Sequence, residues 1–354
     1  MTNRRIVLAS RPHGWVQESD FRVVEAPLPE PTEGEALVRN RYLSLDPYMR
    51  MRMSDAPSYA PCVEVGDVMV GGTVGEVVAS RSPLLAPGDT VTGPLGWQLY
   101  GVASAQRLRR IVDPAAPLSA YLGVLGMPGI TAWVGLELIG PLQPGQALVV
   151  SAASGAVGSV VGQIARIRGC TAIGIAGGSE KCRHVERELG FDACVDYKAP
   201  ALASRLEEAA AKGVDVYFDN VGGPIFDAVL GLLNPFARIA LCGQVSQYNL
   251  TEPYGVRNLR SLLVNRVLLR GFIVSDHMDL WPQASAELTA WVRAGGLPLR
   301  ETINRSDVFP LCFDRQHRTR VVGAAVDNDG ACAAGTAIAH ALLAGNVEAR
   351  PHGV

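Results

Sequence analysis

The sequence predicts an α/β protein in which a doubly wound parallel sheet follows an antiparallel β region. Two observations carry this prediction. From about residue 147 onward, short apolar runs alternate with helical patterns, which is typical of parallel strands joined by right-handed helical crossovers. From residue 4 to about residue 118, Pro and Gly interrupt short strands roughly every 8 to 12 residues, which indicates a compact antiparallel domain.

In the antiparallel region, apolar positions alternate along several runs that end in turn residues. A half-buried strand shows this alternation because successive side chains point to opposite faces of the sheet. A helical pattern follows and extends to Gly140. The expected strands lie within FRVVEAPLPEPTEGEALVRNRYLSLDP, DVMVGGTVGEVVAS and LAPGDTVTGPLGWQLYGVAS.

The parallel region begins with the buried strand ALVVSA, which the helix VGSVVGQIARIR follows. Val160, Val161 and Ile164 share one side of this helix, and Gly169 ends it. Strands and helices then alternate to about Gly295. The further strands are expected at CTAIGIA, ACVDY, VDVYFDN, RIALCG and VLLRGFIV, and the further helices at SEKCRHVEREL, ALASRLEEAAAKG, PIFDAVLGLL and WPQASAELTAWVRAG.

The chain has 354 residues, of which 48% are hydrophobic, and this supports two domains with buried cores. The formal net charge is −2, and Lys and Arg form no recurring block, which disfavours nucleic acid or a membrane surface as partner and favours a small molecule. No stretch reaches the roughly 18 apolar residues of a membrane span, and the apolar core of MTNRRIVLASRPHG is too short for a signal peptide. We therefore expect a cytoplasmic protein.

The seven cysteines form no C-x-x-C pair, and their number is odd. Neither a disulfide framework nor a structural zinc site is therefore indicated, and most of these residues are expected to be small core side chains. Cys242, beside a glycine at a predicted strand end, is the only one expected near a functional site. The cysteines are residues 62, 170, 182, 194, 242, 312 and 332.

The turn after ALVVSA carries a glycine pattern close to G-x-G-x-x-G. A dinucleotide site needs a tight turn, close approach of the backbone to the pyrophosphate and close packing of helix on strand, and each requirement selects glycine. Gly155 and Gly158 are kept, while Ala153 replaces the first glycine. The pattern also fits plain helix-on-strand packing, but its place at the head of the series favours phosphate binding at the helix start. The expected contacts are Ser154, Gly155, Ala156, Val157 and Gly158.

The end of the second parallel strand bears on the choice of cofactor. Sites that prefer NAD place Asp or Glu there to bind the ribose 2′-hydroxyl. This chain has the uncharged residues 177–179, followed by Lys181 one turn later, which predicts NADP(H). Alternatively, Ser179 caps a helix, and Glu180 and Lys181 form a solvated first turn. Tyr197, at the end of the next strand, could cover the same phosphate, although such a tyrosine is more often a packing residue.

Further strand ends are expected at the same edge of the sheet, because ligands in open α/β sheets bind outside the carboxyl ends of the strands. Each residue there is more often structural than functional by itself, but together they form one line of loops. The candidates are Asn220, then Cys242, Gly243, Ser246 and Tyr248, and finally Phe272, Ile273 and Val274.

These residues, with the segments LSLDPYMR, VMVGGTVGEVV, YLGVLGMPGITAW and AASGAVGSVVGQIA, resemble the medium-chain dehydrogenase/reductase superfamily. Within it they are similar to the zinc-independent NADPH-dependent alkenal and enone reductases, also called prostaglandin reductase or leukotriene B4 12-hydroxydehydrogenase-like proteins. The resemblance covers residues from about 4 to 300. DPYMR, GMPGITAW and AASGAVG are specific in combination.

The resemblance implies a split GroES-like catalytic domain (1–125), an inserted Rossmann NADP-binding domain (126–295), a C-terminal return with an atypical tail (296–354) and a homodimer. It also implies hydride transfer from nicotinamide C4 to the β-carbon of an α,β-unsaturated aldehyde or ketone. Zinc-dependent relatives have a Cys ligand and a G-H-E segment, whereas this chain has LDPYMR and no G-H-E, so we predict no catalytic metal. The implied cofactor contacts are Ser154 to Val157, Lys181, Tyr197, Asn220, Cys242 to Tyr248, and Phe272 to Val274.

Two departures from the family pattern concern the substrate cleft and the tail. Met51 stands where the family usually has glycine, and its side chain could narrow the cleft. The segment after Arg305 does not match the usual N-F-G-K segment and final strand, which puts a cofactor contact and the last strand of the catalytic domain in doubt. Asn346 is a weak candidate for that contact, within a tail that predicts one short helix over 335–345.

Reduction of an activated C=C bond needs the β-carbon held against the nicotinamide and a donor for the charge on the carbonyl oxygen. Tyr248 is the first candidate donor or proton relay, and Tyr48 and Tyr59 are the second. Each tyrosine could instead be a rim hydroxyl bonded to backbone, and water could protonate the α-carbon. The alternatives are an NADPH:quinone oxidoreductase of the same superfamily and an NADPH-binding protein whose altered tail impairs catalysis.

Overall fold

The structure is a computed structural model that describes residues 2–112, 114–298, 302–304 and 320–323. The chain divides into two compact units, and each is described by itself. Unit 1 comprises Met1–Leu122 together with the two last strands described, and unit 2 comprises Gly123–Arg300. Cys312, Cys332, Asn346 and the helix predicted over 335–345 lie outside the described residues.

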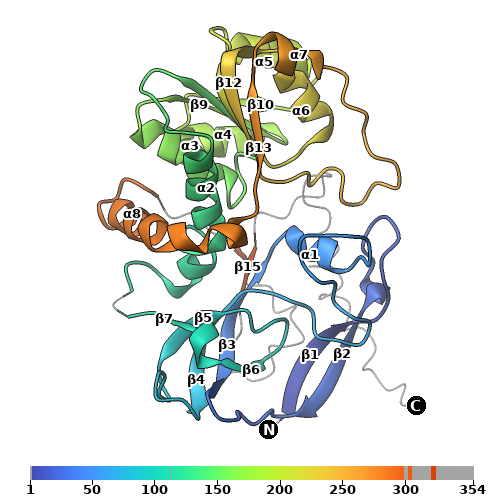
Figure 1. The fold of residues 1–354 in the computed structure, drawn as a ribbon, viewed down its shortest axis with the longest axis vertical. Coiled ribbons are helices and arrows are strands. Elements are labelled where there is room, and N and C mark those ends of the chain that lie inside the picture. Colours follow the sequence, from blue (N-terminus) through green and yellow to red (C-terminus); the bar gives the residue numbers. More distant parts are fainter. Residues whose placement is uncertain (1, 113, 299–301, 305–319, 324–354) are drawn as a thin grey trace, which may run out of the picture. The chain divides into compact units, whose positions relative to one another are not determined.

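Unit 1 is built on a seven-stranded sheet with the order β14-β15-β3-β4-β5-β7, and β6 pairs with β3 beside this path (Figure 1). The pairs are antiparallel except that β15 runs parallel to β3. The described C-terminal strands thus join the sheet of the N-terminal unit. The bounds are β3 Glu35–Leu45, β4 Thr73–Ser80, β5 Thr90–Gly93, β6 Tyr100–Ser104, β7 Arg109–Arg110, β14 Thr302–Asn304 and β15 Arg320–Gly323.

A two-stranded sheet completes unit 1, formed by β1 (Thr2–Leu8) and β2 (Phe21–Pro27). Its core gathers the fully buried Trp97, on which Phe21 stacks at 5.5 Å between ring centroids, with buried methionines of helix α1 and its flank. Burying such large apolar side chains contributes about 1.5–3 kcal/mol each. The helical segments of this unit are η1 Glu18–Asp20, α1 Tyr48–Arg52, η2 Ala105–Arg107 and η3 Leu118–Leu122.

Unit 2 is a six-stranded sheet with the order β10-β9-β8-β11-β12-β13, and all of its strand pairs are parallel. In chain order within the unit this is 3-2-1-4-5-6, the order of the doubly wound dinucleotide-binding fold, with its reversal between β8 and β11. The α/β fold class predicted from the sequence is confirmed. The bounds are β8 Ala147–Ser151, β9 Thr171–Ala176, β10 Ala193–Asp196, β11 Val214–Asp219, β12 Leu233–Leu241 and β13 Leu268–Gly271.

Helices cover both faces of the unit 2 sheet (Figure 1). Helix α3 packs closely because Gly162 faces Phe191, where an added Cβ would lie 1.9 Å from the ring. The two segments α7 and η4 are additions that the sequence pattern did not predict. The helical bounds are α2 Met127–Leu138, α3 Gly158–Ile167, α4 Ser179–Arg187, α5 Leu202–Ala209, α6 Gly223–Leu230, α7 Arg260–Val264, η4 Val274–Leu280 and α8 Trp281–Arg293. Within the described part of the chain, no helix combines the length and apolarity needed to cross a bilayer.

Candidate functional site

The turn from β8 into α3 has the tight geometry that the glycine pattern predicted. Ala152 takes the left-handed conformation (φ 51°), so the sharp bend falls one residue before the position where the pattern would have its first glycine. The carbonyl of Ala152 accepts a hydrogen bond from the N–H of Gly155 at 2.9 Å. Gly158 begins α3, and a Cβ there would lie 2.3 Å from the Ala152 carbonyl oxygen. Only glycine therefore allows the helix to start this close to the strand.

Ser154, Ala156 and Val157 lie half-buried in the turn just before the start of α3. The first-turn N–H groups of a helix have no partner within the helix, and its dipole favours an anion at that end. The turn therefore brings phosphate-binding groups to the carboxyl end of the central strand, at the position where the strand order reverses.

The turn after β9 is uncharged and is braced from the next strand. The ring of Tyr197 lies against Gly177, where an added Cβ would be 2.9 Å from the tyrosine hydroxyl oxygen. Gly178 has φ 95° and caps α4, so Ser179 is not the cap that the alternative interpretation assumed. Asp196 accepts hydrogen bonds from the N–H of Gly178 at 2.7 Å and of Lys198 at 3.0 Å. The sequence analysis did not single out this carboxylate, which holds the turn in place.

The first turn of α4 presents one cation and one carboxylate. Lys181 is half-buried, whereas Glu180 is exposed. The structure thus places Lys181 beside the braced turn, within one helical turn of Gly178. A cation there suits a 2′-phosphate, which it attracts, while the Asp196 carboxylate is engaged by the backbone N–H groups of Gly178 and Lys198.

A buried carboxylate, Asp219, fixes the loop that follows β11. Its side chain is fully buried and accepts hydrogen bonds from the hydroxyls of Ser151 at 2.9 Å and Tyr217 at 2.6 Å. It also accepts the N–H of Gly222 at 3.0 Å. Burial raises the pKa of Asp219, and these hydrogen bonds oppose the rise. Sequence reasoning missed this residue, although its place directly before Asn220 at a strand end was a usable signal.

Asn220 is held between two strand ends. Its backbone N–H donates to the Ser151 hydroxyl and its side-chain amide donates to the Ser151 carbonyl, both at 2.8 Å. The N–H groups of Cys242 and Gly243 donate to the Asp219 carbonyl at 2.9 and 3.1 Å. The ends of β8, β11 and β12 are therefore tied together, as the predicted line of loops requires.

The thiol of Cys242 is not a nucleophile in this setting. Burial, and then the charge of Asp219, raise its pKa to about 12. The thiol stays protonated at neutral pH, and a protonated thiol reacts poorly. Cys242 thus contributes a backbone N–H, which holds the end of β12 to Asp219.

The loop after β12 carries Ser246 and Tyr248. The hydroxyl of Ser246 donates to the Val221 carbonyl at 2.7 Å. The hydroxyl of Tyr248 accepts the N–H of Gln244 at 3.3 Å, while its half-buried ring packs on the core of unit 2. The structure therefore places this tyrosine at the predicted strand end, with its oxygen near the backbone of its own loop.

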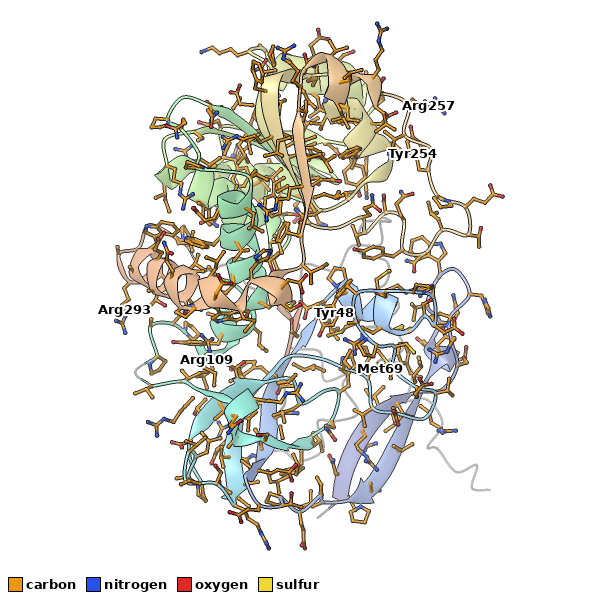
Figure 2. The ribbon with its side chains drawn as sticks, viewed as in Figure 1. Tyr48, Met69, Arg109, Tyr254, Arg257 and Arg293 are labelled. Carbon is orange, nitrogen blue, oxygen red and sulfur yellow. The ribbon has the colours of Figure 1, made fainter. Side chains whose placement is uncertain are left out.

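Asp227 of α6 anchors the far end of the same loop. It accepts hydrogen bonds from the Tyr254 hydroxyl at 3.1 Å and from the N–H groups of Arg257 and Asn258 at 3.0 and 2.8 Å. Figure 2 labels Tyr254 and Arg257, whose guanidinium lies 6.0 Å from the tyrosine ring centroid. The loop that carries Tyr248 is thus fixed at both ends.

Phe272 has a packing role that the sequence did not reveal. Its ring meets Phe218 edge-on at 6.2 Å between centroids and fills the space opposite Gly135, where a Cβ would lie 2.6 Å from it. A contact of this residue with a cofactor would therefore be through its backbone. Ile273 and Val274 follow β13 and are half-buried.

Unit 1 brings Tyr48 and Tyr59 into electrostatic contact near the start of α1, where Figure 2 labels Tyr48. Burial, and then the charge of Asp46, raise the pKa of Tyr48. Burial also raises the pKa of Asp46 to about 6, although a hydrogen bond from Ser44 favours the charged form and partly lowers this pKa. Tyr59 is exposed, and Met51 lies half-buried in α1. Sequence reasoning missed Asp46, although it lies within LSLDPYMR.

The two turns of unit 2 fit an NADP cofactor. Gly158 keeps phosphate-binding N–H groups at the strand end, and Gly177 leaves room for Tyr197 beside an uncharged turn. Within the described residues, no group of three or more His, Cys, Asp or Glu side chains could hold a metal ion. The absence of a catalytic metal stays a prediction.

Two family models match the chain. The model for the N-terminal domain of oxidoreductase matches residues 4–111, and the model for zinc-binding dehydrogenase matches residues 156–290. The first falls in unit 1 and the second in unit 2.

Characterised proteins and solved structures are similar over most of the chain. The NADPH-dependent curcumin reductase of Escherichia coli is 50% identical, over 85% of this chain and 89% of the relative. The 2-alkenal reductase (NADP(+)-dependent) of Nicotiana tabacum is 38% identical, over 83% and 88%. The structure of CurA from Vibrio vulnificus in complex with NADPH has TM-score 0.80 and 46% identity, covering 84% of this chain and 90% of that one. A Pseudomonas syringae quinone oxidoreductase, at 23% identity, shares the fold.

Proposed function

This chain belongs to the medium-chain dehydrogenase/reductase superfamily, in the branch of NADPH-dependent alkenal and enone reductases, and we propose that it reduces the C=C bond of α,β-unsaturated aldehydes and ketones. The reductant is NADPH, and the hydride goes to the β-carbon of the substrate. The similarity to the curcumin and 2-alkenal reductases supports the C=C substrate. The observation that carries the choice of NADPH is the braced turn after β9, whose residues 177–179 are uncharged and which has Lys181 beside it at the carboxyl edge of the sheet. It provides for a 2′-phosphate, which NADPH has and NADH lacks.

We assign the pyrophosphate to the β8–α3 turn, from Ser154 to Gly158. The ribose 2′-phosphate is assigned to Lys181, with Tyr197 covering it. The nicotinamide end is assigned to Asn220 and to the segments Cys242–Tyr248 and Phe272–Val274, which lie at the ends of β11, β12 and β13. Each assignment rests on the carboxyl-edge rule for open α/β sheets.

Bound NADPH supplies the hydride, and the protein supplies position and charge stabilisation. As the β-carbon accepts the hydride, negative charge develops on the carbonyl oxygen of the substrate. A hydroxyl donor at that oxygen lowers the barrier because it stabilises this charge. We propose Tyr248 as the first donor, and Tyr48 and Tyr59 as the second. The proton on the α-carbon comes from one of these hydroxyls or from water.

Unit 1 is proposed to contain the GroES-like catalytic domain, with residues 1–125 as its N-terminal part and 296–354 as its return. Residues 126–295 are proposed as the NADP-binding domain. The pairing of β14 and β15 with the sheet of unit 1 supports the return.

We also propose a cytoplasmic homodimer. Strand β13 ends the six-stranded sheet, all four of its residues are exposed, and an unpaired edge strand can pair with another chain. Leu263, Val264 and Leu268 add an exposed apolar surface beside that edge. The free thiols among the described cysteines support a reducing compartment.

The test is NADPH oxidation by the purified protein with a 2-alkenal, an arylalkenone and a benzoquinone, with identification of the products. We expect the saturated aldehyde and ketone to form, and NADH to be a poor substitute. Turnover with the quinone alone would favour the quinone oxidoreductase alternative. Quenching of NADPH fluorescence without oxidation of any acceptor would favour a binding protein that lacks turnover.

A further inference from the structure

Cys182 of α4 and Cys194 of β10 meet between the helix and the sheet. The thiol of Cys194 donates a hydrogen bond to the sulfur of Cys182, and both residues are free thiols. Cys182 is 7% exposed, and Cys194 is half-buried. The pair was not expected from the sequence, because the two residues are not in a C-x-x-C motif.

The surrounding contacts hold the two sulfurs at this place. The backbone N–H of Cys194 donates to the carboxylate of Glu186, one helical turn after Cys182, at 2.9 Å. Gly174 of β9 pairs with Cys194, and a Cβ on that glycine would lie 3.3 Å from the Cys194 sulfur and 2.9 Å from Val185 of α4. The missing side chain at Gly174 therefore leaves the room that the Cys194 thiol and Val185 occupy.

The two thiols differ in reactivity. The hydrogen bond from Cys194 lowers the pKa of Cys182, and the same bond raises the pKa of Cys194. Cys182 also lies near the N-terminal end of α4, where the helix dipole favours a thiolate. Cys182 is thus suited to attack an oxidant and Cys194 to resolve the product.

We propose that Cys182 and Cys194 form a reversible disulfide when the protein meets a hydroperoxide. The Cys182 thiolate attacks the terminal oxygen of the O–O bond, which breaks to give a sulfenic acid and release the alcohol or water. The Cys194 sulfur then attacks the Cys182 sulfur, the S–O bond breaks, and the sulfenic oxygen leaves as water with the proton of the Cys194 thiol. Overall, two thiols lose two protons and two electrons, and the hydroperoxide is reduced. A small dithiol restores both thiols by exchange.

The Cys182–Cys194 disulfide would disturb the contact that Lys181 and Tyr197 are proposed to make with the 2′-phosphate. This part of the inference rests on the proposed function. A disulfide places its sulfurs about 2.05 Å apart, well inside any hydrogen-bonding distance. Forming it pulls the first turn of α4, which carries Lys181, toward β10, which Tyr197 follows. We therefore expect oxidation to weaken the binding of NADPH and to leave the binding of NADH unchanged.

The experiment treats the full-length protein with hydrogen peroxide and maps its peptides without reduction. We expect a linked Cys182–Cys194 peptide that dithiothreitol removes. The link should also be absent from the Cys182→Ser and Cys194→Ser variants. Cys62→Ser is the matched control, because Cys62 is a free thiol of the other unit, and it should retain the link. Failure to find the linked peptide in the wild-type protein overturns the proposal.

The second readout is the affinity for NADPH before and after oxidation. We expect the Kd for NADPH to rise roughly fivefold, which corresponds to about 1 kcal/mol. The Cys194→Ser variant should show no such rise. A linked peptide with an unchanged Kd overturns the effect on the cofactor. If the reduced protein does not bind NADPH, the proposed function fails, while the peptide map still decides the disulfide.

Discussion

Asp46 allows a quantitative test of how a buried carboxyl makes the stability of unit 1 depend on pH. Burial raises the pKa of this carboxyl from 3.8 to about 6. A rise of about two pH units corresponds to about 3 kcal/mol, at about 1.4 kcal/mol per unit. Because the folded protein binds this proton more tightly than the unfolded chain, the free energy of unfolding falls as pH rises from about 4 to about 6. Above about pH 6, the burial of the charged Asp46 carboxylate lowers the free energy of unfolding by the full amount of about 3 kcal/mol.

The Asp46→Asn variant removes this titration and keeps an oxygen that can accept the hydrogen bond from Ser44. We expect its unfolding free energy to match the wild type near pH 4 and to exceed it by up to about 3 kcal/mol above pH 6. Urea unfolding at several pH values between 4 and 8 measures the difference. Asp67→Asn, at an exposed aspartate, is the matched control and should show no such trend. A difference for Asp46→Asn that does not change with pH would refute the reasoning.

Three further predictions concern the cofactor, the turn and the dimer. Lys181→Ala should raise the KM for NADPH about tenfold, the effect of losing one charged hydrogen bond, while the KM for NADH stays constant; equal effects would reject the role of Lys181. Gly158→Ala should lower the free energy of unfolding by about 1–3 kcal/mol in chemical denaturation, because its Cβ would meet the Ala152 carbonyl. Gly255→Ala, which has open space around it, should be near neutral, and similar losses for both variants would contradict the turn geometry. Leu268→Lys should give a monomer in analytical ultracentrifugation, and a dimer that persists would exclude the β13 edge.

The fold was predictable because its strands and helices each follow their own hydrophobic period. The strand before Ala152 and the helix with Val160 and Ile164 on one side were both found this way, and the structure confirms them. Helix α7 was missed because its five residues are too short for a periodic signal and bury no side chain.

The candidate site was only partly predictable, because its anchors act through burial. Asn220 and Tyr248 were predicted from their places after strand ends, and the structure places them in the loops that follow β11 and β12. Asp219 and Asp196, which hold loops of the candidate site, look like ordinary acidic residues in the sequence. Asp219 binds Ser151, which is 68 residues away, and Asp196 binds Gly178, which is 18 residues away. Contacts between distant residues are not visible in a local pattern.

The two carboxylates that fix the cofactor loops have separate partners. Asp219 links the ends of β8, β11 and β12, whereas Asp196 holds the turn after β9 and the N–H of Lys198. Changes at the two places should therefore be close to additive in their effect on free energy, since sites without shared partners combine independently. On the proposed assignment, the coenzyme preference could be changed at the turn after β9 without disturbing the loops that Asp219 holds.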